Sequence, residues 1–385
     1  MIFRSLNALR VLAEFWVVHA HTFHYMSVFE MNKSLDLFVS GLMSFFFVLS
    51  GFVMTHAHMD DDFSTFRCKK AFWCNRLRKM YPVYFVFWLY DFIHQICGGE
   101  FEDDRALLVC RFMQVPMLNS WMGCSLSIAN LPSWFMATLW WIWFVFPWLL
   151  PLLKRLPLQW PWTIIIALNA GSFAVVVGLY PRGYWYYAQL PPLRGIEFFI
   201  GCVTATTLKT RVHWSWPLGA AVFLVAFYAG VFYTAVLVPN QCHGGVWSFL
   251  TSLPFTDYCM LEWAGLFTTK FAFIWAILIH WFAASEFHDV PNRTFLFLEE
   301  SHLLQTLSTF SIQLYLGHYT IFRTLMGLSQ RMLFRSQLGL HTVFILIYGS
   351  CYLFKLYIQP YLDGYFADET VVTDGCYSVV AEQPN

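Results

Sequence analysis

The sequence predicts an all-α fold, a polytopic helix bundle that crosses a membrane many times. Of the 385 residues, 58% are apolar and only 12% are charged, which is too little polar surface for a soluble protein of this size. Apolar runs of about 20 residues, enough to cross about 30 Å of hydrocarbon, recur along the whole chain. Backbone amides find no water in that layer, so each run is expected to be helical. The lipid bilayer is therefore the expected solvent.

Ten apolar blocks, separated by the polar runs of the chain, are predicted to be transmembrane helices. The first could be mistaken for a signal peptide, but it carries Arg10 and Glu14 and no small-residue cleavage pattern follows it, so it is predicted to be retained. The third is short, and the fourth is rich in Trp and Phe. In chain order, the predicted spans are residues 8–28, 36–58, 82–97, 132–153, 162–180, 192–208, 214–238, 263–284, 303–326 and 339–360.

The chain is expected to form one membrane domain over residues 1–365, followed by a short polar tail over residues 366–385. Gly, Pro and Ser do not gather into a linker, and no repeat recurs at a fixed period. With a cytosolic N-terminus, twelve basic residues fall on the cytosolic side and six on the opposite side. This bias predicts that both termini are cytosolic.

Charge and cysteine content exclude several classes of function. Lys and Arg together number 23, as do Asp and Glu, and no run of basic residues indicates nucleic-acid binding. The ten cysteines show no CxxC spacing, so no metal site is expected. Two pairs fall in loops on the far side of the membrane, where disulfides can persist, with free thiols as the alternative: Cys110 with Cys124, and Cys242 with Cys259.

The first span carries ionisable residues on one stripe. Glu14 lies four residues after Arg10, and His21 lies seven residues after Glu14, so all three share a helix face, whereas His19 points to the opposite side. Charged residues inside a membrane are costly and usually mark a site. The alternative interpretation is that Glu14 only neutralises Arg10 and that His21 is an interhelical contact.

Several motifs together resemble the acyltransferase 3 family, integral membrane enzymes that transfer acyl groups, most often acetyl, from acyl-CoA to sugars and other acceptors. The family's opening helix has Arg, ten residues and then His, which matches Arg10 and His21. Similar segments follow in the family's order: MSFFFVLSGFVM (43–54), NRLRKMYPVYF (75–85), PSWFMATLWWIWFVFP (132–147), EFFIGCVTA (197–205) and FSIQLYLGHYTIF (310–322). The resemblance covers nearly the whole chain.

Three positions depart from the family pattern. Lys79 stands where the basic stretch usually has a second Arg, which replaces a bidentate group with a point charge. Leu139 stands about where many members have an acidic residue, and no Glu precedes the Pro of residues 357–360. These departures bear on the acceptor and the chemistry rather than on the fold.

The resemblance implies a membrane O-acyltransferase that uses acyl-CoA, in most members acetyl-CoA, and a glycan or another hydroxylated acceptor. His21 is predicted to be the general base or, alternatively, a covalent acyl carrier, with Arg10 and Glu14 beside it. The acyl-CoA phosphates are predicted to meet Arg10, Arg76, Arg78 and Lys79, although ordinary flanking charges would also explain the last three. The predicted substrate cavity comprises Ser50, Trp134, Ser311, Tyr315 and His318.

Two other functions remain open at this point. The same intramembrane charges could bind and release a solute or proton in a transporter, although the chain shows neither inverted halves nor paired broken helices. The missing acidic positions would also suit an inactive member of the fold that acts as a binding protein. The sequence predicts no oligomeric state.

Overall fold

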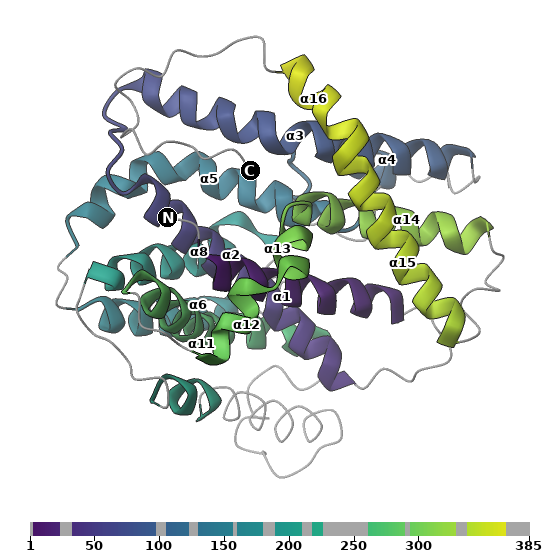
Figure 1. The fold of residues 1–385 in the computed structure, drawn as a ribbon. Helices are drawn as coiled ribbons and strands as arrows, with labels where there is room; N and C mark the ends of the chain where they lie inside the picture. The colour runs from purple at the N-terminus through teal and green to yellow at the C-terminus, as the bar shows by residue number, and fades with distance from the viewer. Residues whose placement is uncertain are drawn as a thin grey trace, which may run out of the picture. The chain divides into compact units, whose positions relative to one another are not determined.

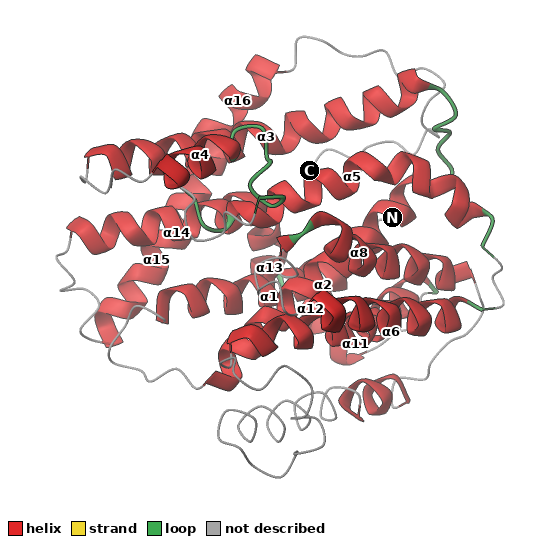
Figure 2. Ribbon diagram, turned by 180° about the vertical axis from the view of Figure 1, so that it is seen from behind, coloured by secondary structure: helices red, strands yellow, loops and turns green. Residues whose placement is uncertain are grey.

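The computed structural model describes residues 3–23, 33–97, 105–122, 130–156, 160–179, 189–209, 218–225, 261–288, 293–328 and 337–366. Within these ranges the chain is helical, with short turns and no strand (Figures 1 and 2). The helices are α1 (Arg4–Phe23), α2 (Lys33–His58), α3 (Phe66–Cys97), α4 (Arg105–Met113), α5 (Ser133–Lys154), α6 (Pro161–Leu179), α8 (Pro191–Thr206), α11 (Leu261–Phe287), α12 (Arg293–Glu300), α13 (His302–Ser308), α14 (Ser311–Leu328), α15 (Gln337–Leu353) and α16 (Gln359–Phe366). A 3-10 turn, η2 (Thr207–Lys209), follows α8, and a π-helical turn, η4 (Phe354–Ile358), joins α15 to α16.

The predicted all-α fold is confirmed for the described residues, whereas the count of ten spans stays a prediction. Three described helices are long and apolar enough to cross a membrane: Gly41–His58, Ser133–Lys154 and His341–Tyr365. A shorter apolar helix covers Ala272–Phe287. Most of the predicted span 214–238 lies outside the described residues, and the sidedness of the termini and the single domain stay predictions.

The helices differ from the predicted spans at three places. α3 begins at Phe66, well before residue 82, because Lys, Arg and Ala before the apolar block are good helix formers. The predicted helix 303–326 is divided into α13 and α14, where Ser308 and Thr309 bond back to nearby carbonyls and compete with the helical bonds. The π turn η4 precedes Pro360, whose missing N–H leaves an i−4 carbonyl without its helical partner.

The chain forms two compact units, and the boundary between them passes through α1. The first unit comprises Met1–Leu9, Asn32–Met59 and Leu152–Ser301. In it α2, α6, α8 and α11 pack against one another. Gly51 of α2 and Gly201 of α8 permit the closest approach, because a Cβ atom at either position would overlap a backbone carbonyl of the other helix. The two backbones are therefore in direct contact.

Two carboxylates of the first unit, those of Glu197 and Glu286, have close partners. Arg194 and Glu197 of α8 are both buried and form an ion pair of 2.8 Å, with the guanidinium over the Phe47 ring. The Glu286 carboxylate accepts hydrogen bonds from the backbone amides of Arg4 and Ser5 at the start of α1. It thereby satisfies amides that a helix start leaves unpaired.

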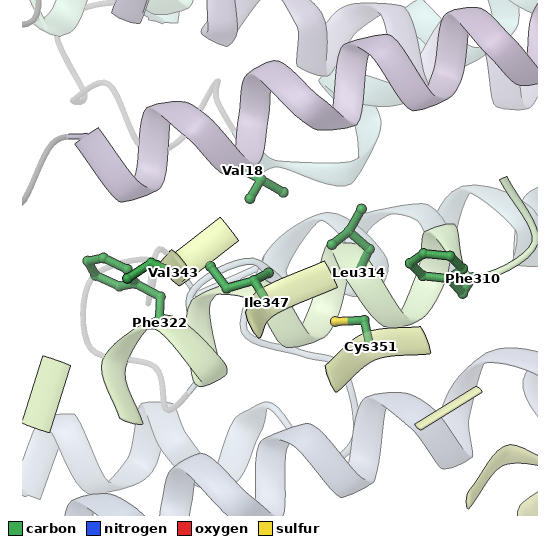
Figure 3. Packing of buried hydrophobic residues seen from close by; sticks show 7 residues of the cluster. All are labelled: Val18, Phe310, Leu314, Phe322, Val343, Ile347 and Cys351. Carbon is green, nitrogen blue, oxygen red and sulfur yellow. The ribbon is translucent and has the colours of Figure 1, made fainter. Parts of the chain in front are cut away.

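The second unit comprises Arg10–Met31, Asp60–Pro151 and His302–Asn385. Its core cluster joins α1, α14 and α15 and is shown in Figure 3. The view shows Val18 of α1 facing Leu314 of α14 and Ile347 of α15. The cluster consists of Val18, Phe310, Leu314, Phe322, Val343, Ile347 and Cys351.

A buried polar network ties α14 to α3 in the second unit. The Asp91 carboxylate accepts hydrogen bonds from Asn130 Nδ2 at 2.8 Å and from the Thr320 hydroxyl at 2.6 Å. The Asn130 amide also donates to the Leu316 carbonyl. All three polar side chains are buried. Because each group bonds to partners from other elements, the network fixes the position of α14.

Among the described cysteines, Cys68 is in a disulfide and so is Cys110. Cys124, Cys242 and Cys259 lie outside the described residues, so both predicted pairings stay predictions.

Candidate active site

The candidate site lies within the second unit, along the contact between α1 and α14. Arg10 Nη2 donates to the Ser308 carbonyl oxygen at 2.8 Å, and the Ser311 hydroxyl donates to the Glu14 carboxylate at 2.5 Å. His21 bonds to His318 at 2.8 Å. Residue numbers rise together on both sides of these contacts, so the two helices run parallel. Glu14 and His21 are seven residues apart, as are Ser311 and His318, a spacing that keeps both contacts on one seam.

The paired imidazoles of His21 and His318 are the centre of the site. Nδ1 of His21 lies 2.8 Å from Nε2 of His318, and the two rings are within 5° of parallel. Nδ1 of His318 lies 3.0 Å from the Leu314 carbonyl oxygen in the preceding turn of α14. His318 is 1% exposed and His21 is partly buried. The buried ring of His318 is thus held by the backbone of α14, and the partly buried ring of His21 is held by His318.

These contacts fix the tautomers when both rings are neutral. A carbonyl oxygen only accepts, so Nδ1 of His318 carries the hydrogen that it donates to Leu314. Nε2 of His318 then accepts from Nδ1–H of His21. The lone pair of His21 therefore resides on Nε2, the nitrogen directed away from His318. That arrangement suits a general base, because a second group orients the ring and receives its other N–H.

Arg10 and Glu14 take partners on other helices rather than each other. Both residues are described, and no ion pair joins them; Arg10 binds the end of α13, and Glu14, 5% exposed, binds the first residue of α14. The break after Ser308 makes the first contact possible, because the last carbonyls of a helix lack helical partners. Arg10 and Glu14 still interact electrostatically across one turn of α1, but each forms its hydrogen bond with another helix.

A chain of aromatic rings lies beside His318. The Tyr315 ring lies 6.2 Å from the His318 ring and 5.1 Å from the Phe135 ring of α5. Trp134 lies edge-on to Phe135 at 6.1 Å, and so continues the same aromatic group. His19 stacks on Phe344 of α15 at 3.8 Å. Trp134, Tyr315 and His318, three of the predicted cavity residues, are thus linked by ring contacts.

The remaining predicted residues belong to other helices. Arg76, Arg78 and Lys79 are on α3, where the Arg76 guanidinium lies 5.6 Å from the centre of the Phe72 ring and 5.7 Å from that of Trp143. Ser50 is on α2 and belongs to the first unit. Among the described residues, no group of three His, Cys, Asp or Glu side chains could hold a metal ion.

Sequence reasoning did not identify two contributors, Ser308 and Tyr348. Ser308 contributes through its backbone carbonyl, which side-chain chemistry does not reveal. Tyr348 of α15 packs against the core cluster and interacts electrostatically with Glu14. The sequence does hold a hint that α14 packs against α1. Ser311 and His318 are seven residues apart, the same spacing as Glu14 and His21.

The sequence is similar to those of known acyltransferases. A family model described as an acyltransferase domain matches residues 3–358. The chain is also similar to "Acyltransferase MdmB" from Streptomyces mycarofaciens, with 29% identity over 210 residues, which is 48% of this chain and 51% of that protein. The match therefore spans about half the length of this relative. No solved structure matches the chain.

Proposed function

Because the chain belongs to the acyltransferase 3 family, we propose that it transfers an acyl group, acetyl in the simplest case, from acyl-CoA to an acceptor hydroxyl. The observation that carries the proposal is the hydrogen-bonded pair of His21 and His318. The Leu314 carbonyl fixes the tautomer of His318, and His318 in turn fixes that of His21. The lone pair of His21 is therefore on Nε2. The acceptor is proposed to be a carbohydrate or a related hydroxylated molecule.

In the proposed reaction, Nε2 of His21 removes the proton of the acceptor hydroxyl as its oxygen attacks the thioester carbonyl carbon. The tetrahedral intermediate then collapses, the carbon–sulfur bond breaks, and the CoA thiolate takes the proton back from His21. While His21 is charged, its Nδ1–H bond to His318 becomes charge-assisted and stronger. His318 is therefore proposed to orient His21 and to stabilise its charged form.

A covalent variant uses the same nitrogen. Nε2 of His21 would attack the thioester carbon itself and expel CoA, and the acyl-imidazole would then pass its acyl group to the hydroxyl. The bond from Nδ1 of His21 to His318 supports either route. A labelled acyl-enzyme trapped with acetyl-CoA alone, without acceptor, would favour the covalent route.

The donor's anionic end is proposed to bind basic groups nearer the cytosol. Arg10 precedes His21 by about 16 Å along the axis of α1, a separation that suits an extended donor with phosphates at one end and a thioester at the other. Arg76, Arg78 and Lys79 of α3 are proposed to add positive charge for the phosphates. The protein would act as an integral, multi-pass membrane enzyme.

The test supplies labelled acetyl-CoA and a panel of glycans and other alcohols to the full-length protein purified in lipid. The native protein is expected to label at least one acceptor, and His21→Ala is expected to abolish the transfer. His19→Gln is the matched control, since His19 belongs to the same helix and stacks on Phe344. Full turnover by His21→Ala, or no transfer by the native protein, would refute the proposal.

A further inference from the structure

The helix α3 is longer than a membrane crossing needs. Its 32 residues extend about 48 Å, whereas the hydrocarbon layer is about 30 Å thick. All of its Lys and Arg residues precede the predicted span 82–97, and no Asp or Glu occurs between Phe63 and Tyr90. The excess length therefore belongs to the first half of α3, outside the hydrocarbon. The basic residues of this half are Arg67, Lys69, Lys70, Arg76, Arg78 and Lys79.

Aromatic rings from α3 and α5 form a cluster along this half of α3. The centre of the Trp73 ring lies 6.1 Å from that of Phe66 on the same helix. It also lies 4.6 Å from Phe144 and 5.2 Å from Trp148, both on α5. The indole N–H of Trp73 donates to the Phe144 carbonyl oxygen at 3.1 Å and fixes the ring there. Phe66 is 70% exposed and Trp148 is 45% exposed. Contiguous exposed apolar surface of this kind marks an interaction site.

Two lysines belong to the same surface. Nζ of Lys69 lies 6.0 Å from the centre of the Trp148 ring, and Lys70 is exposed. Lys69, Lys70 and Trp73 follow Phe66 by three, four and seven residues, a spacing that keeps all four on one side of α3. Lysines and aromatic rings therefore form one surface, the α3–α5 face. Its residues are Phe66, Lys69, Lys70, Trp73, Phe144 and Trp148.

The α3–α5 face lies in a positively charged region, despite an acidic run before it. Asp60, Asp61 and Asp62 precede α3, and Asp62 accepts hydrogen bonds from the amide and the hydroxyl of Ser64. The basic residues of α3 outnumber these carboxylates two to one, and α5 carries no charged residue before Lys154. Positive charge beside exposed aromatic rings is the combination that suits the headgroup layer of an anionic membrane.

We propose that the α3–α5 face binds the headgroups of anionic phospholipids, with Lys69 and Lys70 on the lipid phosphate. The helix α5 is long and apolar enough to cross the membrane, and Trp148 lies about 9 Å before its charged end at Lys154. This position suits the membrane interface, where Trp side chains are enriched. A second copy of the chain fits less well, because a two-fold contact through this face would bring like charges together.

The test uses the full-length protein in nanodiscs of phosphatidylcholine that contain a small share of a photoreactive lipid. The reactive group lies beside the headgroup, either of phosphatidylglycerol or of phosphatidylcholine, and labelled peptides are identified by mass spectrometry. The native protein is compared with Lys69→Gln/Lys70→Gln and with the charge-retaining variant Lys69→Arg/Lys70→Arg. Lys355→Gln is the matched control, because Lys355 is a partly exposed lysine on another element, η4.

In the native protein, the anionic probe is expected to label the start of α3 and the end of α5 about tenfold more than the zwitterionic probe. Each lysine near the surface contributes up to about fivefold to this preference. The double Gln variant is expected to bring the two probes within about twofold of each other, whereas the double Arg variant and Lys355→Gln are expected to keep the native preference.

Three results would overturn the proposal. Equal labelling by the two probes in the native protein would show that charge does not select the lipid. The absence of lipid adducts on these peptides would show that protein covers the face. Displacement of the anionic probe by free CoA would assign the lysines to the acyl donor instead of the membrane.

Discussion

Nδ1 of His21 donates a hydrogen bond to Nε2 of His318 across 2.8 Å, and His318 is itself anchored to the Leu314 carbonyl. The same two helices are joined seven residues earlier by Glu14 and Ser311. Because both intervals are equal, a shift of α14 along α1 would break the two contacts together. The imidazole pair therefore depends on helix register as well as on its own hydrogen bond.

Replacing His318 with Ala is expected to reduce kcat by about 10²- to 10⁴-fold, because His21 would lose the group that fixes its tautomer and stabilises its charged form. His318→Gln is expected to recover about tenfold over Ala, since an amide oxygen can accept from His21. Initial rates at saturating donor measure both effects. Unchanged kcat in His318→Ala would show that His21 acts without this partner.

Part of the site follows from helical periodicity alone. Arg10, Glu14 and His21 recur at intervals that keep one face, so their common stripe is predictable from sequence. Their partners are harder to predict from sequence. Ser311 and His318 contact them only because two helices almost 300 residues apart in the chain pack in a particular register. The break before Ser311 was not predicted, since the apolar pattern continues across it. Local periodicity thus predicts which residues share a face, but not which helix packs against that face.

Gly201→Ala is expected to destabilise the first unit by about 1–3 kcal/mol. The added Cβ would overlap the Val48 carbonyl oxygen and force α2 and α8 apart. Thermal unfolding in detergent measures the change. Gly171→Ala is the control, because a Cβ placed there would lie more than 4 Å from every heavy atom outside its chain neighbours and its own helix backbone. Equal melting temperatures for Gly201→Ala and the native protein would contradict the direct backbone contact.

Thr320→Val is expected to cost about 1–3 kcal/mol, because the nearly isosteric change removes a hydrogen bond of 2.6 Å to the buried Asp91 carboxylate. Thr342→Val is the control, as the Thr342 hydroxyl is exposed and bonds only locally, to the Leu338 carbonyl of its own helix. Urea or thermal unfolding compares the two variants. If both lose the same stability, the Asp91 network does not hold α14 in place.

Glu299→Gln is expected to raise the melting temperature slightly at neutral pH and to have no such effect in acid. Burial, followed by repulsion from Glu286, raises the pKa of the Glu299 carboxyl above its usual value. A carboxyl whose pKa is higher in the folded state favours folding when protonated, and this contribution is lost as pH rises through the folded pKa. Glutamine remains neutral throughout, so it retains the favourable form. Melting curves between pH 4 and pH 8 test this, with Asp60→Asn, at an exposed position, as control. A gain from Glu299→Gln that is equal at both ends of this range would contradict the assignment.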